Sequence, residues 1–148
     1  MIFILNSCLA SRIIAIDPGK TSGVAILTEP FNIKSLAQYT DFKWISDLEI
    51  KSFDTVIWEH YFISGQYFDA SGIEIIGALK LICEKVNCNY IVQHPFIPTF
   101  INVRFGLHNI KFPCSIHAKE ALFHGIYYLR NNINKENIIN EIKRYSSD

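Results

Sequence analysis

The sequence lacks the short cysteine pairs that build small zinc sites. Its 148 residues include four cysteines, and no two of them have the C-x-x-C spacing. The nearest pair, Cys83 and Cys88, is five positions apart. This pattern argues against a zinc ribbon and favours reduced thiols in a cytoplasmic protein, with structural rather than catalytic roles.

The sequence also lacks an excess of charge of either sign. It carries 14 Lys and Arg against 14 Asp and Glu, so its formal net charge is zero. Binding to a polyanion would therefore depend on a local basic patch, on metal ions, or on a patch that a dimer presents twice.

No apolar run approaches the roughly 20 residues that a membrane span needs, so we expect no membrane partner. The first ten residues are apolar, but no basic residue precedes them. We therefore interpret them as a segment that packs on the domain rather than as a secretion signal.

At this length, and with 49% hydrophobic residues, we expect one domain over residues 1–148. Asp41 is the predicted N-cap of the first helix, and Ser71 with Glu74 has capping-box spacing. The segment from Pro95 to Ser115 is predicted to be largely irregular, with one helical turn near Phe100. Periodicity predicts strands over 12–17, 24–27, 31–39, 55–58 and 90–93, and helices over 42–48, 71–86, 116–129 and 135–144. This order predicts an α/β fold: a mixed sheet, with an antiparallel three-strand meander plus parallel strands, flanked by helices.

Asp17 is the most informative single residue. It ends an apolar strand and opens a tight turn over Pro18–Gly23, where Thr21 and Ser22 add hydroxyl groups. A carboxylate at the tip of a buried strand is costly to desolvate unless a cation or hydrogen-bond donors meet it, so its placement indicates a metal or phosphate site. The alternative is an ordinary hairpin turn with a solvated aspartate.

Glu59 repeats this arrangement at the end of the strand over 55–58. If the two strands are neighbours, both acids can reach one cation; otherwise Glu59 is an exposed residue at the start of a loop. On the helix over 116–129, His117 and Glu120 share one face, and His124 follows four residues after Glu120. His124, like His94 and His108, belongs to no motif and is expected to be a surface or core residue.

These residues resemble a known family, the RuvC-like Holliday-junction resolvases of the RNase H-like superfamily, particularly their short phage and viral members. The strongest match is Ile14-Ala-Ile-Asp-Pro-Gly-Lys-Thr-Ser-Gly-Val-Ala-Ile26, which is similar to the family's first acidic motif. Val56-Ile-Trp-Glu59 is similar to the second motif, and His117-Ala-Lys-Glu120-Ala-Leu122 to the acidic helix.

The resemblance implies that Asp17, Glu59, His117 and Glu120 form the catalytic, metal-binding set, with two Mg²⁺ or Mn²⁺ ions. Glu120 stands where the family usually has Asp, and His117 stands where Asp is common. An imidazole in place of a carboxylate would weaken one metal position or favour Mn²⁺. Alternatively, His117 acts on the nucleophile or the scissile phosphate without holding metal throughout.

The resemblance also implies a homodimer that binds branched DNA in the cytoplasm of a bacterial or virus-infected cell. Phe62 is the candidate for probing the junction centre, and the helix over 71–86 is the candidate dimer interface, through Ile73, Ile76, Leu79 and Lys80. A core-facing stripe is the alternative for those positions. The basic candidates for phosphate contacts are Lys20, Arg104, Lys111 and Lys119.

The predicted function is therefore metal-dependent resolution of Holliday junctions by paired, symmetric nicks. One alternative is an RNase H-like nuclease for another branched DNA or RNA substrate. Another is a catalytically inactive nucleic-acid-binding module. A nucleotide-binding fragment of the actin and sugar-kinase type would need a second domain, which 148 residues cannot supply.

Overall fold

The computed structural model describes residues 11–60 and 70–148, which contain a five-stranded sheet with the order β3-β2-β1-β4-β5. The first three strands pair antiparallel, while β4 is parallel to both β1 and β5. The predicted fold class is thereby confirmed. The strands are β1 (Arg12–Asp17), β2 (Ser22–Thr28), β3 (Asn32–Tyr39), β4 (Thr55–Glu59) and β5 (Asn89–Gln93).

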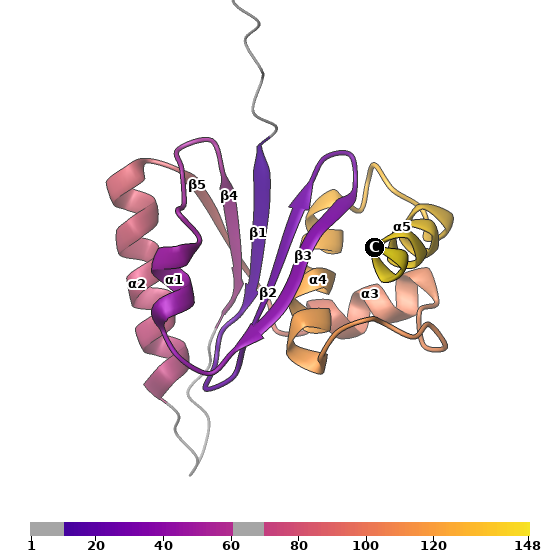
Figure 1. Ribbon diagram of the computed structural model, residues 1–148, viewed down its shortest axis with the longest axis horizontal. Helices are drawn as coiled ribbons and strands as arrows, with labels where there is room; N and C mark the ends of the chain where they lie inside the picture. The colour runs from indigo at the N-terminus through magenta and orange to yellow at the C-terminus, as the bar shows by residue number, and fades with distance from the viewer. Residues whose placement is uncertain (1–10, 61–69) are drawn as a thin grey trace, which may run out of the picture.

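Helices cover both faces of the sheet (Figure 1). One face packs against α1 and α2, and the other packs against α3, α4 and α5. Alternate residues of β1 divide between the two cores: Ile14 and Ile16 face α2, whereas Ile13 and Ala15 face α4. The helices are α1 (Lys43–Asp47), α2 (Ala70–Val86), α3 (Ile97–Phe105), α4 (Ile116–Leu129) and α5 (Lys135–Ser147).

Two glycines let α4 approach the sheet closely. A Cβ atom added at Gly23 of β2 would lie 1.9 Å from the carbonyl oxygen of His117. A Cβ atom at Gly125 would lie 2.4 Å from the Cδ1 atom of Leu27. A larger residue at position 23 would meet helix backbone and displace α4, whereas one at position 125 would require the Leu27 side chain to shift.

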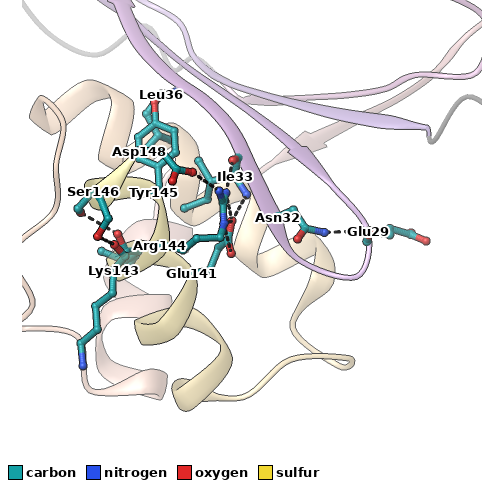
Figure 2. A network of polar contacts seen from close by, with 12 residues as sticks. Glu29, Asn32, Ile33, Leu36, Glu141, Lys143, Arg144, Tyr145, Ser146 and Asp148 are labelled. Carbon is teal, nitrogen blue, oxygen red and sulfur yellow. Dashed lines mark hydrogen bonds and ion pairs between the residues drawn. The ribbon is translucent and has the colours of Figure 1, made fainter.

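Side chains of α5 cover the backbone groups of the edge strand β3 (Figure 2). Ile33 donates its backbone N–H to Glu141 at 2.7 Å, and Arg144 donates to the Ile33 carbonyl at 2.9 Å. The Leu36 N–H donates to the Tyr145 hydroxyl at 3.0 Å. An open sheet edge is a template for pairing with other chains, so these contacts both dock α5 and block that edge.

The segment over 95–115 contains a regular helix, α3, and the prediction of an irregular connection with one helical turn is wrong. The prolines suggested interruption, but Pro98 lies in the first helical turn, where no N–H donor is needed. Ile97, Ile101 and Phe105 are buried at helical spacing, and Gly106 ends the helix with a φ of 60°.

Smaller corrections concern the element ends. The strand β2 begins at Ser22, so the first turn is shorter than predicted. The N-cap of α1 is Phe42, and Asp41 lies one residue earlier, where it accepts a hydrogen bond from the Lys43 N–H at 3.1 Å. Ser71 lies inside α2 rather than at its start, so the capping box proposed there is wrong.

Two further expectations concern membrane spans and the first ten residues. No helix within residues 11–60 and 70–148 is long and apolar enough to span a membrane. The proposed packing of the first ten residues, like the role of Phe62, lies outside the described residues.

Candidate active site

Three polar side chains, Asp17, Glu59 and Gln93, end three adjacent strands of the sheet. In the parallel pairs, Ile16 lies opposite Trp58 and Glu59 lies opposite Gln93, so the three ends form a row across β1, β4 and β5. Asp17 lies two residues after Ala15, and Glu59 lies two residues after Ile57, so each acid points to the same face of the sheet as that apolar residue. Ala15 and Ile57 both belong to the core on the α4 side. The row therefore projects toward α4.

The helix α4 presents His117, Glu120 and His124 to this row. Ser115 caps the helix by accepting a hydrogen bond from the Ala118 N–H at 3.3 Å. Positions three and seven residues after His117 fall on the same side of a helix, so one face carries all three side chains.

Asp17, His117 and Glu120 converge on one point. Each offers one ligand atom, and these three atoms lie within 4.8 Å of one another. Nδ1 of His117 lies 2.9 Å from Oδ2 of Asp17. Asp17 is buried, whereas His117 and Glu120 are half-buried, so the cluster lies at the surface end of the sheet and a small ligand can reach it.

The electrostatics of this cluster are unfavourable without a cation. Burial raises the pKa of Asp17 to about 7; the hydrogen bond from His117 lowers it, while the negative charges of Glu120 and Glu59 raise it. A carboxylate that is both buried and repelled by other carboxylates is a strong ligand for a positive ion. Two carboxylates with one imidazole form a donor set that suits Mn²⁺ and, through the oxygens, Mg²⁺.

Glu59 connects to a second group of residues that the sequence motifs did not identify. The His124 side chain is fully buried, with Nε2 3.1 Å from Oε2 of Glu59 and Nδ1 2.7 Å from Oε1 of Gln93. His124 is a core residue, as expected, but the expectation did not include its contacts with Glu59 and Gln93. The available signals were its helical spacing from Glu120 and the position of Gln93 at a strand end, like Asp17 and Glu59.

The proposed phosphate-binding residues are spread more widely. Lys20 is exposed in the turn after Asp17, and Lys119 lies between His117 and Glu120 in the sequence, with its Nζ atom 5.7 Å from the Phe112 ring centroid. Arg104 lies in the last turn of α3, where its guanidinium is 5.9 Å from the centroid of Phe100. Lys111 is exposed in the connection between α3 and α4. Their DNA contacts stay predictions, as does that of Phe62.

Comparison with known proteins gives a match only at the level of structure. No protein-family model matches the chain, and no curated protein is similar to it in sequence. RuvC of T. thermophilus bound to a Holliday junction superposes with a TM-score of 0.56 at 13% identity, covering 82% of this chain and 96% of RuvC. The Fowlpox virus resolvase, in complex with Holliday junction DNA, gives 0.57 at 17% identity, covering 80% of this chain and 99% of the resolvase. These likenesses confirm that the chain has a RuvC-like variant of the RNase H-like fold.

Proposed function

We propose that this chain is a metal-dependent endonuclease domain that resolves four-way DNA junctions as a homodimer, by paired symmetric nicks. The observation that carries the proposal is the convergence of Asp17, His117 and Glu120 at the end of β1, with Glu59 on the adjacent strand. RuvC of T. thermophilus and the Fowlpox virus resolvase, which share this fold, are both bound to Holliday junction DNA. At 13–17% identity, these likenesses support the fold alone, and the proposed chemistry rests on the residues of this chain.

The donor set fits divalent ions. Asp17, Glu59 and Glu120 would supply hard oxygen ligands, and His117 would supply one nitrogen. Bound divalent ions, two in our proposal, would lower the pKa of an attacking water and stabilise the negative charge that develops on the scissile phosphate. Asp17 and Glu120 hold the negative charge that attracts the ions, and the His117 hydrogen bond fixes the orientation of Asp17.

Charge distribution along the chain supports a nucleic-acid partner on the α3–α4 side. Residues 89–130 contain four basic residues, Arg104, Lys111, Lys119 and Arg130, and one acidic residue, Glu120. The rest of the chain holds the other 10 basic and 13 acidic residues, from totals of 14 and 14. The chain has no net charge but does have a basic segment, and this segment includes His117 and Glu120 of the cluster.

Homodimerisation follows from the substrate, because two opposed cuts need two sites at a fixed separation. We propose α2 as the interface, with Ile73 and Lys80, which are exposed, and Ile76, which is half-buried. Leu79 is fully buried in the core against the sheet, so it is not an interface residue. We place this activity in recombination or repair in the cytoplasm of a bacterial or virus-infected cell.

The test is cleavage of a labelled synthetic four-way junction in Mg²⁺ or Mn²⁺, beside linear duplex, flap and RNA controls. Asp17→Asn removes the central carboxylate, and Asp47→Asn makes the same change at an exposed position of α1. We expect paired nicks from the wild type and Asp47→Asn, and none from Asp17→Asn. Binding without cleavage in either metal would instead identify an inactive binding module. Cleavage confined to flaps or RNA would keep the nuclease and change its substrate.

A further inference from the structure

We propose that His124 is a positioning residue that holds Glu59 in the orientation needed for metal binding, with Gln93 fixing the imidazole from behind. This inference rests on the proposed function, because it assigns His124 and Gln93 a role toward the same site. Neither residue belongs to the motifs that identified the cluster.

The three side chains form one continuous chain of hydrogen bonds. Glu59 and Gln93 lie opposite each other on β4 and β5, and the His124 ring from α4 contacts both. The two contacts are 3.1 Å to Oε2 of Glu59 and 2.7 Å to Oε1 of Gln93. His124 has no exposed surface, and Gln93 is only 7% exposed, so water does not compete for the bond between them.

The direction of the bond to Glu59 follows from the donor and acceptor groups. An ionised carboxylate only accepts hydrogen bonds, so Nε2 of His124 must carry the proton that it donates to Glu59. The amide of Gln93 has a carbonyl that accepts and an NH₂ group that donates, and turning the amide exchanges them. Gln93 can therefore partner Nδ1 whether or not Nδ1 carries a proton.

Packing alone does not explain a histidine at this position. A fully buried imidazole must recover the hydrogen bonds that it loses from water, whereas a leucine of similar size would have none to recover. The imidazole instead forms a hydrogen bond with Glu59, whose side chain is 25% exposed at the edge of the candidate site. The buried end of the chain is thus rigid, and the exposed end is the group that a ligand would meet.

Holding one oxygen of Glu59 prepares the other side of the carboxylate for binding. A free glutamate has three side-chain torsions to order, and that entropy would otherwise be lost when a ligand binds. Partners behind a metal ligand act in this way in known metal sites, where removing one typically weakens metal affinity by about 10–100-fold. We expect His124 to have the same effect here.

The experiment measures Mn²⁺ binding by calorimetry without DNA, so that it does not depend on turnover. His124→Leu keeps most of the volume and removes both hydrogen bonds, and we expect about 10–100-fold weaker binding. His124→Gln keeps an N–H that can reach Glu59, and it should restore affinity to within a few-fold of wild type. Gln93→Leu leaves the histidine but frees its orientation, so its loss should be smaller.

The matched control is Phe123→Leu, the neighbouring α4 residue, which is buried and packs edge-on against Phe112. Its loss of packing should lower the thermal unfolding midpoint and leave Mn²⁺ affinity unchanged. His124→Leu leaves the buried Gln93 carbonyl without its partner, so it should also lower the unfolding midpoint, but unlike Phe123→Leu it should lower Mn²⁺ affinity. In the cleavage assay, raising the Mn²⁺ concentration should restore the rate of His124→Leu, because the defect is in metal affinity.

The outcomes separate this inference from the proposed function. If the wild type binds Mn²⁺ and cleaves junctions, but His124→Leu binds Mn²⁺ with wild-type affinity, the positioning role is wrong and the nuclease stands. If His124→Leu and Phe123→Leu both lose stability and affinity in proportion, the histidine is only structural, and the inference is again overturned. If the wild type binds no Mn²⁺, the proposed function fails, and the role of His124 fails with it.

Discussion

Two buried carboxylates, Asp17 and Glu141, have opposite surroundings. They are similarly buried, at 8% and 9% exposed. Burial would raise the pKa of Glu141, but hydrogen bonds from Arg144 and the Ile33 N–H, with the charge of Arg144, bring it below its ordinary value. At Asp17, burial, with the added repulsion from Glu120 and Glu59, outweighs the hydrogen bond from His117 and raises the pKa to about 7.

This difference separates a structural carboxylate from a functional one. Glu141 is compensated within the protein, and it holds α5 on the edge of the sheet (Figure 2). Asp54 is a second compensated case, since it is 1% exposed and accepts from the Arg12 guanidinium at 2.7 and 3.1 Å. Asp17 is left with a charge that an external cation would neutralise. Burial alone therefore does not distinguish the two kinds, whereas the partners of each carboxylate do.

The largest expected effect is that of Asp17→Asn. Junction cleavage should fall by more than about 100-fold, the upper end of what removing a partner behind a metal ligand costs. Thermal stability without metal should stay equal or rise, because an amide has no charge to desolvate. Parallel cleavage and thermal melting measurements check both. A large loss of stability would mean that Asp17 is compensated after all.

The pH dependence of metal binding should be the next largest effect. Because the pKa of Asp17 is about 7, protons compete with metal below that pH. Mn²⁺ affinity should rise about tenfold per pH unit from pH 5 to 7 and then level, as linkage of one proton requires. Calorimetry across this range gives the slope, and a flat profile would contradict the assignment.

The same pKa predicts an unusual pH dependence of folding without metal. Its folded value of about 7 lies above the ordinary 3.8, so the native state binds more protons than the unfolded state between these values. Stability should therefore fall as pH rises from about 4 to 7 and stay level above, by at most about 4 kcal/mol. The difference in urea unfolding between wild type and Asp17→Asn isolates this contribution, and identical pH profiles would exclude it.

Gly23→Ala should disturb the site through the helix that faces it. The added Cβ atom would meet the His117 carbonyl, so α4 must move, and overpacking of this kind costs about 1–3 kcal/mol. Mn²⁺ affinity should fall with stability, because His117 moves away from Asp17. The control is Gly77→Ala in α2, where a Cβ meets nothing within 4 Å and a gain of about 0.5–1 kcal/mol is expected. Unchanged affinity in Gly23→Ala would show that α4 need not be held so closely.

Glu141→Gln should have the smallest effect of the series and a purely structural one. The amide loses the charge-assisted bonds to Arg144, at an expected cost of about 1–3 kcal/mol, toward the low end because Arg144 is partly exposed. Urea unfolding measures this loss. Mn²⁺ affinity should not change, and a parallel drop would show that the two regions are coupled.

The pattern of short apolar and β-branched runs is enough to predict the strands, because β1, β2 and β4 bury side chains on both faces of the sheet. It also predicted that Asp17 and Glu59 end strands, and the register of β1 and β4 explains why these ends are adjacent. The sequence does not predict the nine-residue helix α3, because its prolines are typical of an interruption, although the first turn of a helix accepts proline.

The hydrogen-bonded partners could not be predicted, because they are distant in sequence. His124 is 31 residues from Gln93 and 65 from Glu59, and Glu141 is 108 from Ile33. No local pattern specifies which face of a helix meets which strand end at that separation. The sequence thus indicates which acids are unusual, and only the packing shows which of them have partners.

The most direct test of the proposed junction-resolving activity is cleavage of a supercoiled plasmid that extrudes a cruciform. Paired nicks at one junction linearise the plasmid, whereas a single nick relaxes it to an open circle. We expect linear product from the wild type in Mg²⁺ or Mn²⁺ and none from Asp17→Asn. Equal products from the wild type and Asp17→Asn, or no cleavage by the wild type in either metal, would contradict it.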